Sequence, residues 1–270
     1  MIDILLSTYN GEAYLSEQLT SILNNTCQDF RILVRDDGSS DRTVNIVRDF
    51  ASAYPEKVFL IEDGRGNLGP TKSFEALARC VTSDYFMFSD QDDFWCDRKI
   101  EHSLNCLQAL ERAHEPGTPC LAFTDLYVVD KELHLLNDSF IRSNRLDAGV
   151  IGDIHKTLAL SVAPGCTMIM NRFVLERVFP FPAEVTHDFW VMILTVRYGA
   201  AAFLDEPTIK YRQHGHNVLG ARMRGSYLLS KLSRISSWFR VYGVLFRALP
   251  FRVNYLKFIF WKCYYIVVRI

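Results

Sequence analysis

Several features that would place a protein in a narrow class are missing from this sequence of 270 residues. Its seven cysteines form no C-x-x-C pair, which argues against a disulfide framework or a structural zinc site and favours a reducing compartment. No uncharged apolar run reaches the length of about 18 residues that a membrane-spanning helix needs. Because apolar residues make up 49% of the chain, we expect a folded domain with a sizeable core rather than disorder.

Negative charge is missing from the last part of the chain. The last acidic residue is Glu206, and residues 207–270 contain 12 Lys and Arg. Residues 1–206 contain the other 18 basic residues and all 31 acidic ones, so the net charge of -1 hides an acidic body and a basic tail. The neutral total gives no sign of a nucleic-acid partner, and we expect none.

The first half of the chain alternates short apolar runs with apolar residues at helical spacing. The runs are typical of buried parallel strands and cover residues 2–6, 30–34, 58–61 and 85–88. This order predicts an α/β fold with a mainly parallel sheet and helices on its faces. Further along, the pattern predicts strands at 121–124, 167–170 and 201–204, and helices at 98–113, at 188–198 and beyond residue 226, with a break at Pro250.

A polar segment follows each of the first four predicted strands. The segments are Ser7-Thr8-Tyr9-Asn10, Asp36-Asp37-Gly38-Ser39-Ser40-Asp41, Asp63-Gly64-Arg65-Gly66-Asn67-Leu68-Gly69 and Ser89-Asp90-Gln91-Asp92-Asp93. In open α/β sheets, ligands bind at the carboxyl ends of the strands. We therefore expect the functional site at this edge.

The segment Asp90-Gln91-Asp92-Asp93 is the densest group of acids. Carboxylates this close repel one another unless a cation neutralises them, and Mg²⁺ or Mn²⁺ takes oxygen ligands that it shares with a substrate's phosphates. The functional interpretation is a metal–diphosphate site. The alternative is a solvated helix start that Asp93 caps.

The pair Asp36-Asp37 has two interpretations as well. A carboxylate here can accept the imide N–H of uracil or thymine. The alternative is a turn followed by a helix that Ser40 or Asp41 caps.

The segment Gly64-x-Gly66-x-x-Gly69 matches the dinucleotide-binding fingerprint in its letters. Glu62 and Asp63 would repel a pyrophosphate, and the motif follows the third strand rather than opening the first βαβ unit. A turn with Pro70 at the first helical position is therefore the favoured interpretation.

Two later segments carry further candidates. Asp188 follows His187 at a predicted helix start, where it is either a general base or a simple helix cap. In the segment Tyr211–Asn217, Arg212 can hold a phosphate and His214 can ligate a metal, whereas the alternative is a surface loop.

Seven short motifs occur together in the order Ser7-Thr8-Tyr9-Asn10-Gly11, Asp36-Asp37-Gly38-Ser39-x-Asp41-x-Thr43, Asn67-x-Gly69, Ser89-Asp90-Gln91-Asp92-Asp93-x-Trp95, Gly165-Cys166-Thr167, His187-Asp188-x-Trp190 and Tyr211-Arg212-x-His214-x-x-Asn217. With them the chain resembles the bacterial family 2 glycosyltransferases of the GT-A fold, and most of all the rhamnosyltransferase-like subgroup of O-antigen and capsule enzymes. The resemblance covers about residues 1–220, so we expect a GT-A domain there and a membrane-associating helical tail at 221–270.

The resemblance implies a role for each matching residue. Thr8, Tyr9, Asn10, Asp36, Asp37, Asn67 and Asp90 would bind the donor nucleotide. Asp92 and His214 would hold Mg²⁺ or Mn²⁺, and Arg212 and Gln91 would lie near the diphosphate. Asp188 would be the catalytic base, and Gly165, Cys166, His187 and Trp190 would line the acceptor region. The full Q-x-x-R-W motif of processive synthases is absent.

The implied activity is inverting transfer of a sugar from a nucleotide donor to a hydroxyl group of a growing cell-surface glycan. The resemblance favours dTDP-rhamnose, with a UDP-hexose as the alternative, and an acceptor linked to undecaprenyl diphosphate. It places the enzyme peripherally on the cytoplasmic face of the bacterial inner membrane, with the tail on anionic lipid. Rival interpretations are a nicotinamide-dependent oxidoreductase, a metal-dependent phosphatase, a membrane-binding module, and a tail that packs on the catalytic domain.

Overall fold

The computed structural model describes residues 1–214 and 235–269, and side chains are described from residue 239 in the second range. The expected domain boundary at residue 220, the motif residue Asn217 and the first part of the tail lie outside these ranges. The strands are β1 (Ile2–Thr8), β2 (Phe30–Asp36), β3 (Val58–Leu60), β4 (Tyr85–Ser89), β5 (Phe94–Trp95), β6 (Cys120–Val129), β7 (Leu135–Asn137), β8 (Met168–Asn171) and β9 (Ala200–Arg212). The longer helices are α1 (Leu15–Leu23), α2 (Thr43–Ala53), α3 (Pro70–Ala78), α4 (Lys99–Arg112), α8 (His187–Tyr198), α10 (Ile235–Ala248) and α11 (Tyr255–Val268). Shorter turns of helix are α5 (Phe140–Ser143), α6 (Ile154–Ala159), α7 (Leu175–Val178), η1 (Ala148–Gly152), η2 (Gly165–Thr167) and η3 (Arg172–Val174).

The strands form one sheet in the order β3-β2-β1-β4-β8-β6-β9-β5, with β7 paired to β6. β1, β2, β3 and β4 are parallel to one another, and β6 and β9 are parallel to each other. β8 runs antiparallel between β4 and β6, so β6 and β9 point the same way as the first four strands. This confirms the predicted mainly parallel sheet of a GT-A fold.

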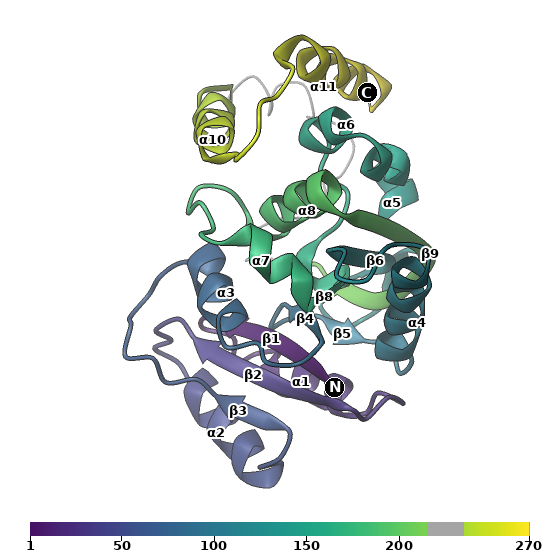
Figure 1. Cartoon of the computed structure of the whole chain (residues 1–270). Helices are drawn as coiled ribbons and strands as arrows, with labels where there is room; N and C mark the ends of the chain where they lie inside the picture. Colours follow the sequence, from purple (N-terminus) through teal and green to yellow (C-terminus); the bar gives the residue numbers. More distant parts are fainter. Residues whose placement is uncertain (215–234, 270) are drawn as a thin grey trace.

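Successive side chains of a strand point to opposite faces of the sheet, so a hydrophobic core forms on each face. On β1, Ile4 and Leu6 face one cluster while Leu5 faces the other. The first cluster includes residues of α1, α2 and α4, and the second includes residues of α3, α6, α8, α10 and α11. The sheet is therefore buried on both faces, which explains why its strands are continuous apolar runs in the sequence (Figure 1).

The late strands are longer than the sequence pattern predicts. β9 runs through the acid pair and Pro207 to Arg212, because it pairs with β6 across register shifts near Asp125. The prediction of a short strand at 201–204 missed this extension. Its consequence for the site is large, since β9 brings Arg212 and His214 to the end of β4.

The tail packs on the body of the protein. Tyr242 of α10 donates a hydrogen bond to the Leu158 carbonyl (2.9 Å), and Lys262 of α11 donates one to the Ala159 carbonyl (2.7 Å). Figure 1 shows α11 next to α6, and both α10 and α11 at the end of the molecule opposite β3. Within residues 1–214 and 235–269, no helix has the length and apolar character needed to span a bilayer.

Candidate active site

The acid cluster lies where the carboxyl end of β4 meets the end of β9. Asp92 and His214 come together here, with 2.8 Å between Asp92 Oδ2 and His214 Nε2. The His214 ring stacks on Tyr14 with a centroid separation of 5.0 Å. The structure therefore joins the two residues that the sequence nominated as metal ligands, although 122 positions separate them in the chain.

Negative charge at this edge is dense and poorly neutralised. Burial, followed by the charges of Asp92 and Asp188, raises the pKa of Asp90 to about 7. Asp93 is fully buried, and burial, followed by the charges of Asp90 and Asp92, raises its pKa well above the ordinary value. Its Oδ2 atom has no hydrogen-bond partner among the described residues. A divalent cation would relieve this repulsion, so the donor set fits one.

The buried groups behind the acid cluster identify which residues suit a hard cation. Cys166 is fully buried and its pKa is raised well above the ordinary value by burial, so it stays a thiol. Burial also lowers the pKa of Lys99 to about 8, and its Nζ lies 4.7 Å from the Trp95 ring centroid. Ligand atoms of Asp90, Asp93 and Cys166 lie within 4.8 Å of one another, and Asp92 pairs with His214. Because Mg²⁺ and Mn²⁺ prefer oxygen and imidazole ligands to a thiol, the carboxylates and the imidazole of this group suit such a cation better than Cys166 does. The alternative interpretation of Asp93 as a helix cap is wrong, because β5 follows it.

Asp188 lies in the first turn of α8, against the same cluster. Its charge raises the pKa of Asp90, so the two carboxylates are electrostatically linked. Asp188 Oδ1 accepts a hydrogen bond from the Phe189 N–H (2.7 Å), which is a helix N-terminal contact. The N-cap residue of α8 is Thr186, without a side-chain cap hydrogen bond, so Asp188 is an acid of the first helical turn rather than the cap.

The structure divides the Asp36-Asp37 pair. Asp37 is buried, and it accepts hydrogen bonds from the N–H groups of Leu68 and Gly69 (2.8 Å each). Asp36 lies at the open edge, where it accepts a bond from Thr8 Oγ1 (3.0 Å) and lines a hollow of about 150 Å³. Asp36 also accepts hydrogen bonds from the N–H groups of Gly38 and Ser39, so it holds the turn after β2 while it stays half-buried at the edge, whereas Asp37 is buried and holds the loop before α3.

Gln91 and Tyr9 brace the ends of β1 and β4 against each other. Gln91 accepts a hydrogen bond from the Tyr9 N–H (2.8 Å) and donates one to the Tyr9 carbonyl (3.0 Å). A Cβ on Gly11 would lie 2.4 Å from Gln91 Oε1, so only glycine fits there. The structure directs the Gln91 amide to the backbone rather than to a diphosphate.

Asn10 and Asn67 make hydrogen bonds within the loops at the carboxyl edge of the sheet. Asn10 has φ of 47° and accepts a hydrogen bond from the Ser40 N–H (2.9 Å). Asn67 is exposed and accepts one from the Gly69 N–H (3.2 Å). Both residues lie at the predicted edge.

Arg212 is buried rather than aimed at open space. Its side chain is 3% exposed, pairs with Glu17 and the Lys131 carbonyl, and donates to the Asp92 carbonyl (3.0 Å). The guanidinium also lies 4.6 Å from the Tyr14 ring centroid. These contacts fix the Asp92 backbone, so the structure gives Arg212 a supporting place and does not bear out its expected place at the diphosphate.

The predicted acceptor residues separate into two groups. A Cβ on Gly165 would lie 2.6 Å from His187 Nε2 and 3.5 Å from Asp188 Cβ, so Gly165 and His187 lie next to Asp188. Trp190 is 3% exposed and its indole N–H donates to the Val178 carbonyl (2.6 Å). Trp190 and the buried Cys166 therefore belong to the core, and their expected place on an acceptor surface was wrong.

The glycine segment forms a loop and a helix start. Gly69 precedes α3, Pro70 is its first residue, and Asp37 accepts the Gly69 N–H. That N–H is therefore engaged by a carboxylate in the place where a dinucleotide site would offer it to a pyrophosphate. The favoured interpretation as a turn is consistent with this geometry.

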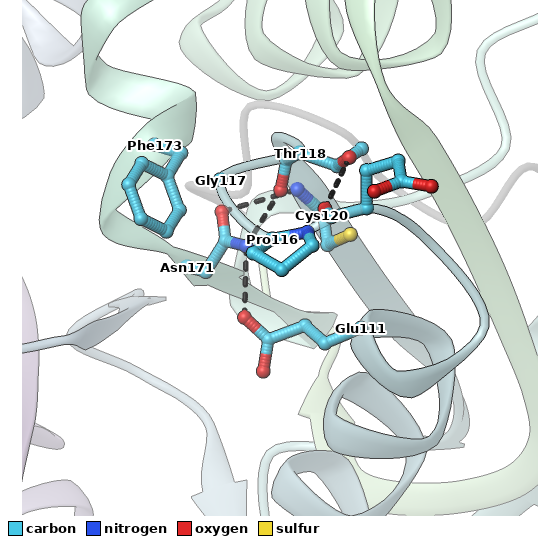
Figure 2. Close-up of a pocket in the computed structure, with 8 residues that line it drawn as sticks. Glu111, Pro116, Gly117, Thr118, Cys120, Asn171 and Phe173 are labelled. Carbon is cyan, nitrogen blue, oxygen red and sulfur yellow. Dashed lines mark hydrogen bonds between the residues drawn. The ribbon is translucent and has the colours of Figure 1, made fainter.

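A second cavity lies far along the chain from these motifs. It has a volume of about 270 Å³ and lies around the start of β6, the end of β8 and the end of α4. Figure 2 shows Asn171 bonded to Glu111 (2.9 Å) and to the Thr118 carbonyl (2.9 Å) in its wall. It includes no residue that the sequence nominated.

Sequence reasoning missed Arg35, which is 1% exposed and bonds to both Asp37 and Asp63. It also missed Glu17 and Tyr14, which hold Arg212 and His214 from α1 and the turn before it. A signal for Arg35 was present, because a charged residue closes an otherwise apolar strand. No local pattern marks Glu17 or Tyr14, since their partners lie about 200 residues away along the chain.

The chain has an α/β fold, and its candidate site lies at the carboxyl edge of the sheet. The family model for glycosyl transferase family 2 matches residues 3–179, and the chain belongs to that family. It is 26% identical to the dTDP-rhamnosyl transferase RfbG of Shigella flexneri over 248 residues, which cover 87% of this chain and 81% of that protein. It is 25% identical over 220 residues to an uncharacterized glycosyltransferase of Rickettsia typhi, covering 79% of this chain and 64% of the relative.

Solved structures show the same fold at lower identity. The mannosyltransferase PcManGT from Pyrobaculum calidifontis, in complex with GDP-Man and Mn²⁺, aligns with a TM-score of 0.64 and 17% identity, covering 97% of this chain and 69% of that one. S. aureus TarS 1-349 in complex with UDP-GlcNAc aligns with a TM-score of 0.62 and 15% identity, covering 95% and 69%. The family that the motifs suggested is therefore confirmed.

Proposed function

We propose that this protein is a metal-dependent, inverting rhamnosyltransferase that uses dTDP-rhamnose. It transfers the sugar to a hydroxyl group of a growing cell-surface glycan carried on undecaprenyl diphosphate. The donor assignment is supported by the 26% identity to a dTDP-rhamnosyl transferase, and a UDP-hexose remains the alternative donor. The placement of Asp188 against Asp90, at the edge that also holds Asp92 and His214, is the observation on which the proposal depends most.

The donor would lie along the ends of β1, β2 and β4. Asp36 offers a half-buried carboxylate to the imide N–H of the base, beside a hollow of about 150 Å³ with apolar walls from Val44, Leu60 and Ile61. Asp90 follows β4, two strands further on with β1 between, so a nucleoside at Asp36 would extend its diphosphate across the end of β1 toward the acid cluster. This order matches the chemistry of a nucleotide-sugar from base to sugar.

Asp90, Asp92 and His214 would hold Mg²⁺ or Mn²⁺. The ion would supply positive charge for the diphosphate as it leaves. Arg212 contributes by fixing the Asp92 backbone, and Tyr14 packs against the His214 ring. The Mn²⁺ that accompanies GDP-Man in the archaeal mannosyltransferase supports a divalent cation in this site.

Asp188 would act as the general base. Its carboxylate takes the proton of the acceptor hydroxyl as the oxygen attacks the anomeric carbon, and the dTDP group leaves from the opposite face. One displacement of this kind inverts the configuration. Gly165 lies close to both Asp188 Cβ and the His187 ring, and this packing restricts the position of the Asp188 carboxylate.

The experiment that tests the donor is a hydrolysis and transfer screen. Purified protein with Mn²⁺ is offered dTDP-rhamnose, UDP-glucose, UDP-N-acetylglucosamine and GDP-mannose, with and without a lipid-linked acceptor. Acceptor-dependent release of dTDP alone supports the proposal. Release of UDP or GDP in preference to dTDP would replace rhamnose as the donor sugar.

Membrane association is part of the same proposal. The outer side of α11 exposes Leu256, Phe260 and Val267 (81%, 62% and 70% exposed), and residues 207–270 carry basic residues without any acid. Exposed apolar groups among basic ones suit an anionic membrane surface. A peripheral place on the cytoplasmic face of the inner membrane would bring the site to its lipid-linked acceptor.

A further inference from the structure

Arg35 is a buried arginine near the end of β2. Its side chain is 1% exposed, and it lies immediately before the Asp36-Asp37 pair. Nε and Nη2 donate to the two oxygens of Asp63 (2.9 and 3.4 Å), and Nη1 donates to Asp37 Oδ1 (2.6 Å). A guanidinium fork matched to two carboxylates is a rigid junction, because its donors have a fixed geometry.

The same side chain also holds the loop between β3 and α3. Nη2 donates to the carbonyls of Arg65 and Gly66 (3.0 and 3.1 Å), and Nη1 donates to Ser73 Oγ (3.1 Å) at the start of α3. Arg35 therefore connects the sheet, the loop and the helix that follows it. The hydrogen bonds to Asp63 hold the pKa of that carboxyl well below its usual range, so it is ionised at neutral pH.

The loop has little packing of its own. A Cβ built on Gly64, Gly66 or Gly69 would meet no atom within 4 Å, and Gly64 and Gly69 have φ of 68° and 77°. Such a segment has many accessible conformations unless polar contacts restrict it. The contacts that restrict it are those of Arg35, together with the Asp37 carboxylate on the Leu68 and Gly69 N–H groups.

The position of the loop decides the shape of the donor edge. Asp63, Gly64 and Arg65 line the hollow of about 150 Å³ beside Asp36. A shift of the loop would therefore move a wall of that hollow, although Arg35 itself does not line it.

We propose that Arg35 is a positioning residue for the donor, which acts by clamping residues 63–69 through Asp37 and Asp63. The inference rests on the proposed function only in that the nucleotide binds beside Asp36. It predicts that Arg35 governs nucleotide affinity and leaves the chemical step, which takes place at Asp188, nearly untouched.

The chain offers a matched control on the same strand. Arg31 also pairs with a buried carboxylate, donating from Nε to Asp3 Oδ1 (2.6 Å) and from Nη2 to Asp3 Oδ2 (3.2 Å). Arg31 lies at the amino end of β2 and far from the donor edge in register, since it pairs with Asp3 rather than Thr8. Loss of either arginine removes a buried ion pair, but only loss of Arg35 releases the loop.

The test compares Arg35→Met, Arg35→Lys and Arg31→Met in the full-length protein. Calorimetry measures the affinity for dTDP and UDP with Mn²⁺, and steady-state kinetics measures KM and kcat for dTDP-rhamnose. We expect Arg35→Met to weaken nucleotide binding and raise KM by about 10- to 100-fold, with kcat within about threefold of wild type. Arg35→Lys should recover only part of the affinity, because lysine lacks the fork. Arg31→Met should lower Tm without changing affinity.

A second readout reports the loop without any nucleotide. Arg65 lies in the exposed loop, so trypsin should cleave after it faster in Arg35→Met than in wild type or Arg31→Met. If Arg35→Met does not fold, Asp63→Asn takes its place, because it removes the charge at nearly constant volume. Nucleotide affinity equal to wild type in a folded Arg35 variant, or an equal loss in Arg31→Met, would overturn the proposal. If the wild type binds only GDP or ADP, the dTDP-rhamnose donor fails while the clamp is tested with that nucleotide.

Discussion

Buried carboxylates at the two ends of the sheet have opposite electrostatic environments. At the amino end, Asp3 is fully buried and accepts hydrogen bonds from Arg31 (2.6 Å), the Thr82 N–H (2.9 Å) and the Ser83 hydroxyl (2.8 Å). Burial opposes ionisation there, but these hydrogen bonds outweigh it and lower the pKa of Asp3. At the carboxyl end, Asp90 faces Asp92 and Asp188, and its pKa rises to about 7.

The difference separates stability from function. The carboxylate of Asp3 needs no ligand, because protein groups neutralise its charge and donate hydrogen bonds to it. Asp90 and Asp93 are incomplete, since their nearest charged neighbours are other acids and, behind them, Lys99. An arrangement that costs folding energy persists where a ligand completes it. The comparison therefore marks the carboxyl end as the working end of the sheet.

The largest effect should come from Asp188→Asn. The amide keeps the size of the side chain and the contact with the Phe189 N–H but takes no proton, so transfer should fall by about 10²- to 10⁴-fold. The measurement is kcat for dTDP-rhamnose, with nucleotide affinity by calorimetry as the control, which should stay near wild type. Turnover like that of wild type would remove Asp188 from the base role.

The next test substitutes one aspartate at each end of the sheet by asparagine. Asp3→Asn should lower the free energy of unfolding by about 3 kcal/mol, because it leaves Arg31 without its charge partner, and it should keep the activity of the folded enzyme. Asp90→Asn should raise the stability of the cation-free protein, on the order of 1–3 kcal/mol near neutral pH, while abolishing activity. Urea denaturation of both variants checks the signs. A loss of stability in both would contradict the division between the two ends.

A third prediction concerns pH and the cation. The pKa of Asp90 is raised in the folded protein, so its contribution to stability is present below the ordinary aspartate pKa and is lost as the pH rises through about 7. The cation-free protein should therefore lose this contribution progressively as the pH rises from the ordinary aspartate pKa of 3.8 to about 7, and Mn²⁺ should raise Tm more at the upper end of this range than at the lower end. Thermal scans with EDTA and with Mn²⁺ measure this. An equal Mn²⁺ shift at both pH values would argue against a cation at Asp90.

The smallest effect should come from the outer face of α11. Leu256→Glu with Phe260→Glu removes apolar surface and adds negative charge, so binding to vesicles with anionic lipid should weaken by about tenfold. The control is Leu135→Glu with Leu136→Glu, which changes two exposed apolar residues on β7. Co-sedimentation with vesicles provides the measurement. If the two double variants bind equally, α11 is not the membrane-contacting surface.

Much of the fold could be predicted from the sequence because it depends on short-range patterns. The first four strands, the helices between them and the break at Pro250 all appear where local apolar spacing placed them. The ends of β6 and β9 could not be predicted, because their extension depends on pairing with each other across register shifts. The docking of the tail on α6 also depends on contacts between distant segments.

The candidate site divides in the same way. Asp36, Asp90, Asp92 and Asp188 were nominated by motifs at strand and helix ends, and the structure gathers them at one edge. The different contacts of Asp36 and Asp37 were not visible, because the N–H groups that Asp37 accepts belong to Leu68 and Gly69, more than 30 residues away along the chain. Arg212 was expected at the diphosphate, but it is buried beside Glu17 because α1 lies against β5, which pairs with β9.

The sequence by itself determined that the polar segments after the first four strands gather at one edge, because the local alternation of β and α elements makes these strands parallel. Tertiary structure alone decided which of those residues remain available to a ligand. Arg35 forms ion pairs with Asp37 and Asp63 but not with Asp36, which lies at the edge. Arg31 forms an ion pair with Asp3. The physical reason is that a charge becomes structural or functional according to the partners that folding brings within hydrogen-bond distance, and those partners are distant in sequence.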